Sequence, residues 1–458
     1  MIQLRRCLAA LVIALSAVGG AVLPAQAQIE GDITRGTFEP MPVAVPAFAG
    51  DTPEATAVGA DIAGVIASDL GGSGLFRLIG EDAFIERNLD ISVLPRFADW
   101  KVVQAEALVV GRTYLDPTGR LVAQFRLYDV FAGRQLFSQE YAVPSQESWR
   151  RIAHIIADDV YEQLTGDGGY FDTRVVFIAE SGPKTNRTRR LAIMDQDGAN
   201  PEFLTDGRYE VLTPRFSPSS QTIIYTALVP DRVNPRIERR RVFLFDIETG
   251  RQEVIGDFPG MSFAARFAPD GRSVAMSMEQ AGNSDIYVMD LARRNRVRLT
   301  TSQAIDTSPS YAPEGDRIVF NSDRGGSSQL YVMNADGRPM SCPSGGSSDA
   351  CRITFGQGRY STPVWSPRGD LIAFTKQANG RFYIGVIKPD GTGERLLTEA
   401  YLDEGPTWSP NGRVIAFFRE RAPGAQPQLW SVDLSGRNLK LMTTPGSASD
   451  PAWSPVLR

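Results

Sequence analysis

The sequence predicts an all-β six-bladed β-propeller that is preceded by a small α/β domain. Three observations support this prediction. A short motif around a Ser-Pro or Ala-Pro step recurs six times after residue 213, an apolar strand follows the motif in the first five copies, and residues 28–169 share none of this periodicity. Self-similarity at roughly 40–50 residues indicates one supersecondary unit that is repeated around a ring or along a stack.

The bulk composition is that of a folded protein with several structural units. A chain of 458 residues is too long for one ordinary core, so several domains or a repeat array are expected. A hydrophobic content of 42% with 22% charged residues excludes a disordered chain. The 43 glycines and 30 prolines are spread along the whole length, which indicates many turns and short strands.

The first 27 residues have the pattern of a signal peptide. Arg5 and Arg6 precede an apolar run at 7–23, and Ala25-Gln26-Ala27 forms an A-x-A cleavage site. The run contains two glycines and is shorter than the roughly 20 strongly apolar residues that a membrane-spanning helix needs. We therefore expect export with cleavage after Ala27, and an uncleaved anchor is the alternative.

The charge of the mature chain argues against two classes of partner. Residues 1–27 hold two arginines and no acidic residue, so their removal leaves 46 basic against 53 acidic side chains, a net charge of −7. A negative net charge disfavours bulk affinity for nucleic acid or for anionic lipid.

Two cysteines remain after cleavage. Cys342 and Cys351 flank the short sequence PSGGSSDA. An even pair of cysteines across a short flexible loop of an exported protein predicts one disulfide. A metal site would need further ligands nearby, and the surrounding sequence offers none.

The repeats predict the blades of the propeller. Their prolines fall at 218, 269, 313, 367, 410 and 455, in steps of 51, 44, 54, 43 and 45 residues. A second half follows, as in IYVMDLARRNRVRLT at 286–300, so that one unit contains about four short strands separated by turns. The six copies read PRFSPSSQTIIY (214–225), ARFAPDGRSVAM (265–276), PSYAPEGDRIVF (309–320), PVWSPRGDLIAF (363–374), PTWSPNGRVIAF (406–417) and PAWSPVLR (451–458).

The turn and the strand after each Ser-Pro step favour a closed ring. Pro269-Asp270-Gly271 and Pro410-Asn411-Gly412 place glycine where the turn needs a positive φ. The next strand is apolar on consecutive positions, as in VIAF at 414–417, which indicates burial on both faces between neighbouring blades. A linear stack would need polar caps at its ends, whereas a ring needs none.

The last copy stops before its apolar strand, at DPAWSPVLR (450–458). The segment RVVFIA at 174–179 matches RVIAFF at 413–418 and precedes a second half, LAIMDQDGANPEFLT (191–205), that has no Ser-Pro step of its own. These two half-repeats together make one blade. The propeller is therefore predicted to contain six blades over 170–458, closed by pairing of its two ends.

The residues before the propeller predict a small α/β domain at 42–165, joined to it by a Gly-Asp-Gly-Gly linker at 166–169. Helical periodicity and strand-like runs indicate its elements. We expect strands at 42–48, 107–114, 121–131 and 135–141, a helix from Thr52 to about Leu70 with Val58, Ile62, Val65, Ile66 and Leu70 inward, and a helix at 148–164 with Trp149, Ile152, Ile156, Val160 and Leu164 inward.

Residues 28–41 lie between the cleavage site and the first expected strand. They show little core-forming pattern. Composition leaves two interpretations open, a frayed terminus or a short segment that binds a partner in an extended conformation.

The chain resembles the TolB family of periplasmic Tol-Pal system proteins. It shares with that family, in this order, an A-x-A signal, a small α/β domain and a ring of WSPDG-like repeats that is closed by an N-terminal strand. The resemblance covers essentially the whole mature chain. Its most specific part is the combination of PMPVAVPAF (40–48) with LDEGPTWSPNG (402–412).

The resemblance implies a non-enzymatic periplasmic linker, monomeric and not inserted in a membrane. Such a protein binds the outer-membrane lipoprotein Pal through one propeller face and the inner-membrane protein TolA through its mature N-terminal segment. The system maintains outer-membrane integrity and supports envelope constriction at cell division. The implied TolA-binding residues are Gln28, Ile29, Glu30, Gly31, Asp32, Ile33, Thr34, Arg35, Gly36, Thr37 and Phe38.

Candidate Pal-binding residues lie in the loops just before each Ser-Pro strand, because these loops cluster on one rim of the ring. A mixture of aromatic and charged side chains suits a protein interface. For any single residue, an ordinary loop position or turn cap is the alternative. The candidates are Tyr209, Glu210, Phe263, Asp306, Ser308, Arg359, Tyr360, Tyr401, Asp403, Glu404 and Asp450.

Enzymatic and metal chemistry find little support in the sequence. A propeller that gates a serine peptidase needs a catalytic triad and usually a G-x-S-x-G elbow, and the sequence has no such motif. Its one histidine, His154, is expected to be a surface or packing residue. No cofactor is expected, although a Ca²⁺ held by oxygens in the channel stays open. The alternative function is a propeller that binds or cleaves envelope glycans or peptides.

Overall fold

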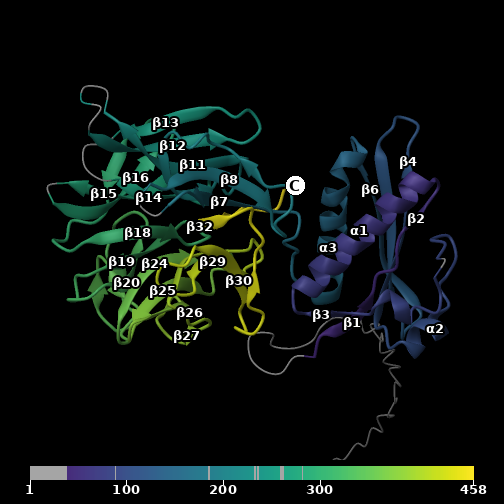
Figure 1. The fold of residues 1–458 in the computed structure, drawn as a ribbon. Helices are drawn as coiled ribbons and strands as arrows, with labels where there is room; N and C mark the ends of the chain where they lie inside the picture. The colour runs from purple at the N-terminus through teal and green to yellow at the C-terminus, as the bar shows by residue number, and fades with distance from the viewer. Residues whose placement is uncertain are drawn as a thin grey trace, which may run out of the picture.

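The computed structural model describes residues 39–87, 89–183, 186–231, 234, 237–257, 262–280 and 282–457. The expected signal peptide and the implied TolA-binding residues 28–38 lie outside the described residues. The chain forms two bodies side by side, a propeller and a smaller α/β domain (Figure 1). None of the helices in the described ranges is long and apolar enough to cross a membrane.

The α/β domain is a sheet in the order β3-β1-β4-β5-β6, with β2 added to β4. The pairs β1–β3 and β1–β4 are parallel, and β4–β5–β6 form antiparallel hairpins. Its elements are β1 Met41–Ala44, β2 Ala49–Gly50, α1 Pro53–Gly72, β3 Phe76–Leu78, η1 Glu81–Ala83, α2 Phe97–Val102, β4 Ala107–Leu115, β5 Leu121–Asp129, β6 Arg134–Val143, η2 Gln146–Ser148 and α3 Trp149–Thr165.

The two faces of this sheet pack against different helices. Val109 on β4 packs with Ile62 of α1 and Ile156 of α3, whereas its neighbour Val110 packs with Trp100 of α2, because successive side chains of a strand point to opposite faces. The helices α1 and α3 therefore cover the face of the sheet that is turned toward the propeller, as Figure 1 shows.

Local signals start and end the two long helices where expected. Thr52 caps α1 by accepting the amide of Ala55 at 3.1 Å, and Pro53 follows at the first helical position. Gly166 ends α3 with a φ of 74°. The expected strand at 42–48 is shorter in the structure, where β1 ends at Ala44 and β2 begins only at Ala49. Pro46 between them has no amide hydrogen to donate to a ladder.

The propeller consists of six four-stranded sheets among the described residues, as the repeats predict. An additional hairpin, β21 Met340–Ser341 with β22 Ser347–Ser348, projects from the third blade. The first blade contains β10 Glu210–Phe216, β11 Thr222–Pro230, β12 Glu238–Asp246 and β13 Gln252–Asp257, and the second contains β14 Ser262–Phe267, β15 Ser273–Gln280, β16 Asn283–Asp290 and β17 Arg296–Arg298. The third contains β18 Asp306–Tyr311, β19 Arg317–Ser322, β20 Gln329–Asn334 and β23 Cys351–Arg352, and the fourth contains β24 Arg359–Trp365, β25 Ile372–Ala378, β26 Arg381–Ile387 and β27 Arg395–Leu396. The fifth contains β28 Leu402–Trp408, β29 Val414–Glu420, β30 Gln428–Asp433 and β31 Lys440–Leu441, and the sixth contains β32 Ser447–Trp453, β7 Arg174–Ser181, β8 Thr188–Asp195 and β9 Glu202–Phe203.

The sixth blade confirms the predicted closure. Strand β32 pairs with β7 in antiparallel register, with Ala452 opposite Val176 and Trp453 opposite Val175. The indole Nε1 of Trp453 donates to the Thr173 hydroxyl at 2.8 Å. Residues almost 280 positions apart therefore hold the ring shut.

Each innermost strand of the propeller contains a β-bulge at the same place. The register shifts in all six, and the bulged residue lies in the left-handed region five residues before the proline of the Ser-Pro step. Bulges bend a strand and re-aim its side chains. The bulged residues are Thr213, Ala264, Ser308, Thr362, Gly405 and Asp450.

Candidate functional site

The starts of the six innermost strands lie at one end of the ring, because each innermost strand contacts the next around the circle. Of the candidates for Pal binding, Tyr209 and Tyr401 are 38% and 37% exposed, and Arg359 is exposed as well. Phe263 is the second residue of β14. Glu210 is half-buried and forms an ion pair with Arg189. We call this end of the propeller, where residues 209, 359 and 401 are exposed, the open rim.

Three of the candidates are fully buried, which corrects the expectation that their side chains face a partner. Asp403 accepts two hydrogen bonds from the Arg419 guanidinium at 2.6 Å, and a third from Thr398. Asp306 is paired with Arg324 at 2.9 Å. A buried charge requires such a partner, so these acids hold their loops in place from inside the blade.

Tyr360 is the third of these buried residues. Its hydroxyl donates to the Glu394 carboxylate at 2.9 Å, and Lys376 pairs with the same carboxylate at 2.7 Å. Burial raises the pKa of Tyr360 above its ordinary value, so this hydroxyl remains a donor. Its role is therefore to support the loop that exposes Arg359.

The remaining candidates belong to the innermost strands of the ring. Ser308 and Asp450 are the bulged residues of β18 and β32, and Glu404 precedes the bulged glycine of β28. Burial raises the pKa of Glu404, and the nearby charge of Asp450 raises it further. Burial also raises the pKa of Asp450, against the lowering effect of Arg215.

A metal in the channel would need more ligands than these two carboxyls. Among the described residues, the group of three or more His, Cys, Asp or Glu ligand atoms that lie close together is Asp69, His154 and Asp197, at the contact between the two domains. A Ca²⁺ held by oxygens in the channel therefore stays a hypothesis.

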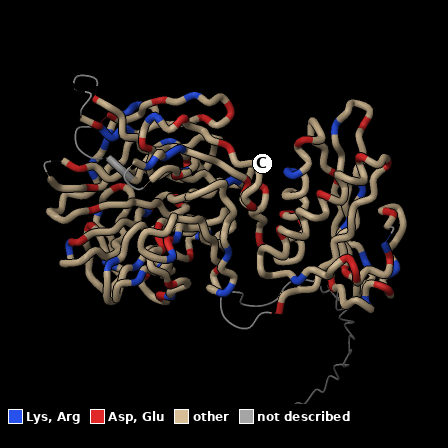
Figure 2. Tube along the Cα trace, viewed as in Figure 1, with Lys and Arg blue, Asp and Glu red and all other residues tan. Residues whose placement is uncertain are grey.

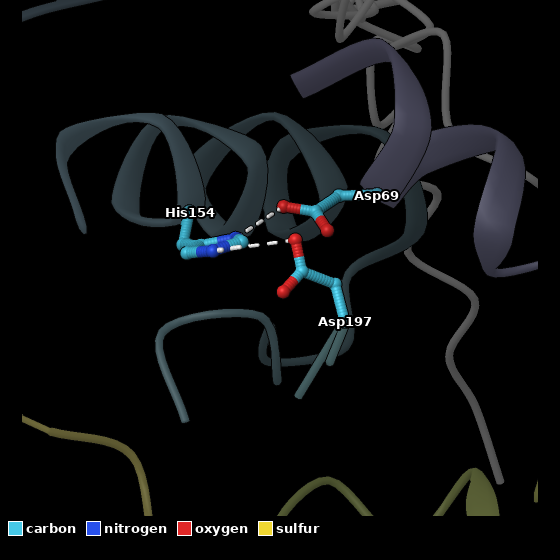
Figure 3. A group of neighbouring side chains, drawn as sticks. All are labelled: Asp69, His154 and Asp197. Carbon is cyan, nitrogen blue, oxygen red and sulfur yellow. Dashed lines mark hydrogen bonds and ion pairs between the residues drawn. The ribbon is translucent and has the colours of Figure 1, made fainter. Parts of the chain in front are cut away.

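The domain contact is a buried charged cluster (Figure 3). Nδ1 of His154 on α3 is 2.6 Å from Oδ2 of Asp69 on α1, and both side chains are almost fully buried. From the propeller, the Gln196 amide donates to the other oxygen of Asp69 at 2.8 Å. Asp197 lies 3.9 Å from Nε2 of His154 and pairs with Arg150. We call these five residues the interdomain cluster.

The carboxylates of the interdomain cluster raise the pKa of His154. Burial works to lower the pKa of His154, but the hydrogen bond and charge of Asp69 and the charge of Asp197 outweigh it, so that the pKa is raised. Each carboxylate already accepts a donor from a neighbouring side chain, which makes the cluster a docking contact between domains.

The linker between the domains is held by the same kind of interaction. Asp167 pairs with Arg368 at 2.8 Å and with Arg413 at 2.5 Å, and both arginines belong to turns of the propeller. The carboxyl of Asp158 accepts the amides of Phe171 and Asp172, at 2.6 and 3.0 Å. Burial raises the pKa of Asp158 to about 7.

Sequence reasoning missed the interdomain cluster. His154 is buried and bonded across helices, whereas the sequence suggested a surface or packing residue. Asp69 is 85 positions away, and no local pattern connects the two residues. A polar residue on the inward side of each of two amphipathic helices is the one signal that could have suggested the pair.

A disulfide joins Cys342 and Cys351, whose Cα atoms are 5.3 Å apart. It closes the β21–β22 hairpin against β23 in the third blade. The insertion that holds it accounts for the longest step between the repeats.

Comparisons with known proteins agree with this architecture. Residues 29–136 match a family model described as the TolB amino-terminal domain, and residues 161–457 match the TolB beta propeller domain. The chain is 45% identical over 442 residues to the Tol-Pal system protein TolB of Gluconobacter oxydans, covering 95% of this chain and 90% of that protein. A crystal structure of TolB from Acinetobacter baumannii matches with a TM-score of 0.77 at 27% identity, covering 91% of this chain and 97% of that one.

Proposed function

Because the chain belongs to the TolB family, we propose that it is a non-enzymatic adaptor that links Pal at the outer membrane to TolA at the inner membrane. Members of this family are periplasmic components of the Tol-Pal system and do not constitute an enzyme family. The match of both domains to the family, over almost the whole chain, is the observation that carries the proposal.

Pal binds at the open rim in this proposal. The exposed Tyr209 and Tyr401, with the guanidinium of Arg359, are the residue types that dominate protein interfaces. The buried ion pairs of Asp306 and Asp403 hold the loops around them, so the rim is pre-organised and little ordering entropy is lost on binding. Acidic and basic residues are interspersed over both bodies (Figure 2), and a mixed surface suits a protein partner better than nucleic acid.

TolA binds residues 28–38 in this proposal, directly ahead of β1. An extended segment of this length suits addition to the edge of a partner's sheet. Through these two contacts the protein maintains outer-membrane integrity and supports envelope constriction at division.

The two contacts are tested by mixing the mature protein with the soluble domains of Pal and TolA, with and without residues 28–38. We expect the full mature chain to bind both domains and the shortened chain to bind Pal alone. If neither domain binds, the adaptor proposal fails, and an envelope glycan or peptide becomes the ligand to test. If the shortened chain still binds TolA normally, the assignment of the segment is wrong.

The open rim is tested by Tyr401→Ala and Tyr209→Ala. Truncation of an interface aromatic weakens binding by about 2 kcal/mol or more where it is a hot spot. Phe131→Ala is the matched control, because Phe131 is 59% exposed and lies between β5 and β6 of the α/β domain rather than on the propeller. We expect Pal affinity to fall in at least one tyrosine variant and to stay unchanged in the control.

A further inference from the structure

The propeller has a cavity of about 390 Å³ where its channel opens at the Ser-Pro end, opposite the open rim. Each of the six innermost strands contributes one residue to the lining of this cavity. That residue lies two positions after the bulged residue and directly follows a proline or an alanine. Cavities of about 300–1,000 Å³ are typical of small-molecule sites. The six residues, which we call the post-bulge ring, are Arg215, Arg266, Ser310, Val364, Thr407 and Ala452.

Two neighbouring members of the post-bulge ring are arginines. Arg215 on β10 is only 8% exposed, its Nη1 donates to the Pro214 carbonyl at 2.6 Å, and its Nε has no hydrogen-bond partner among the described residues. Arg266 lies on the adjacent strand β14, and no ion pair or hydrogen bond connects it to another described residue. Two guanidinium groups therefore face one cavity with donors to spare.

The positive charge of this pair is incompletely compensated. Burial lowers the pKa of Arg266, and the charge of Arg215 lowers it further. Burial also lowers the pKa of Arg215, but Asp450 on the other neighbouring strand works against this. Like charges in a partly desolvated site repel each other, and an anion between them would convert the repulsion into two attractions.

Ser310 lies next to Arg266 in the ring and offers a further donor. Its Oγ accepts the backbone amide of Trp365 at 3.1 Å, which leaves the hydroxyl hydrogen to point elsewhere. Aromatic residues of the Ser-Pro motifs, Tyr311, Trp365 and Trp408 among them, form the surrounding wall. The cavity thus combines convergent donors on one side with an apolar wall around them.

We propose that this cavity binds an oxyanion, with a carboxylate or phosphate group held between Arg215 and Arg266 and a hydrogen bond from Ser310. The planar guanidinium presents paired N–H donors that match both of these groups. The cavity is larger than a bare ion, and its aromatic wall fits the apolar body of a small organic acid. This proposal is independent of Pal and TolA binding, since the cavity lies at the end of the channel away from the open rim.

The test uses the full mature protein in a chloride buffer free of phosphate and sulfate. Thermal melts and calorimetric titrations are performed with sodium phosphate and with sodium benzoate, each against sodium chloride of equal ionic strength. We expect a saturable rise in melting temperature with at least one of the two anions. A response to phosphate alone identifies an inorganic or phosphorylated ligand, and a stronger response to benzoate identifies an organic acid.

Arg266→Gln is expected to weaken the anion by about tenfold or more, the effect of losing a charge-assisted contact. In the chloride buffer the same variant should melt above the wild type, because it removes one of two repelling charges. Arg266→Lys keeps the positive charge, so we expect it to disturb folding less than Arg266→Gln does. It lacks the paired donors of the guanidinium and should bind the anion more weakly than the wild type. Arg293→Gln, an exposed site in the same blade, is the control with an unchanged response.

The proposal is overturned if neither anion gives a saturable response in the wild-type protein. It is also overturned if both Arg266 variants respond to the anion as strongly as the wild type does.

Discussion

Removal of residues 450–458 is expected to open the propeller, because these residues include the second half of β32, the strand that closes the sixth blade. Trp453 is buried with its ring centroid 5.9 Å from that of Tyr170. The backbone amide of Ser454 donates to the Arg174 carbonyl at 2.8 Å, and that of Leu457 donates to the Asp172 carbonyl at 3.0 Å. Without these contacts the first half of β7 remains paired with β8 on one side only and becomes an exposed sheet edge.

The magnitude follows from the contacts that are lost. Truncation of a buried tryptophan costs about 3–5 kcal/mol. Each of the two backbone hydrogen bonds contributes about 1 kcal/mol. The sum of about 5–7 kcal/mol is comparable with the whole free energy of unfolding of a typical domain, which is about 5–15 kcal/mol.

Differential scanning calorimetry and amide hydrogen exchange measure this effect. We expect the truncated protein to melt far below the full chain and to lose protection in β7. Trp408→Ala is the matched control, because Trp408 is buried in the fifth blade to the same degree and its Nε1 donates to the Val364 carbonyl at 3.0 Å. That variant should lower the melting temperature and leave β7 protected. A truncated chain with wild-type melting temperature and slow exchange in β7 would refute the closure.

Three further predictions concern side chains away from the closing blade. The pKa of His154 is raised in the folded protein, so the contribution of its charge to stability is present below pH 6.5 and is lost as pH rises through the folded pKa. His154→Gln should therefore flatten the pH dependence of the melting temperature above pH 6.5. Asp403→Ala leaves the guanidinium of Arg419 buried without its carboxylate and should lower the free energy of unfolding by about 3–5 kcal/mol in urea titrations, whereas a drop below 1 kcal/mol would contradict the buried pair. Replacing Cys342 and Cys351 with serine should cost roughly 2–3 kcal/mol by the loop-entropy relation, and an equal loss in wild-type protein treated with reductant would show that the disulfide alone is responsible.

Much of the fold could be predicted because its determinants are local and repeated. Six Ser-Pro or Ala-Pro steps at similar spacing, the first five of them followed by an apolar strand, predict six equivalent blades, and the six four-stranded sheets confirm this. The partner of the incomplete last copy could be found because RVVFIA at 174–179 resembles the apolar strand RVIAFF at 413–418 of another copy. The short elements β3 and α2 were not expected, because segments of three and six residues carry too little periodicity to be recognised.

The candidate site could be predicted only in outline. The positions of the loops follow from the repeat, so the rim could be located along the chain. Which side chains face outward could not be deduced, because Asp306 and Asp403 look like solvent-exposed loop acids until their arginines are placed opposite them across a hairpin. The same holds for His154, whose partner lies on another helix.

The number of blades, their order and the pairing of the two ends follow from the amino-acid sequence, because each of these depends on patterns that recur at a regular spacing. The folded structure was needed to show which polar groups are buried, which of them join the two domains, and that Arg215 and Arg266 share one cavity. The physical reason is that charge pairing and desolvation depend on distance in space. Residues from separate blades or domains come within that distance only after the ring has closed.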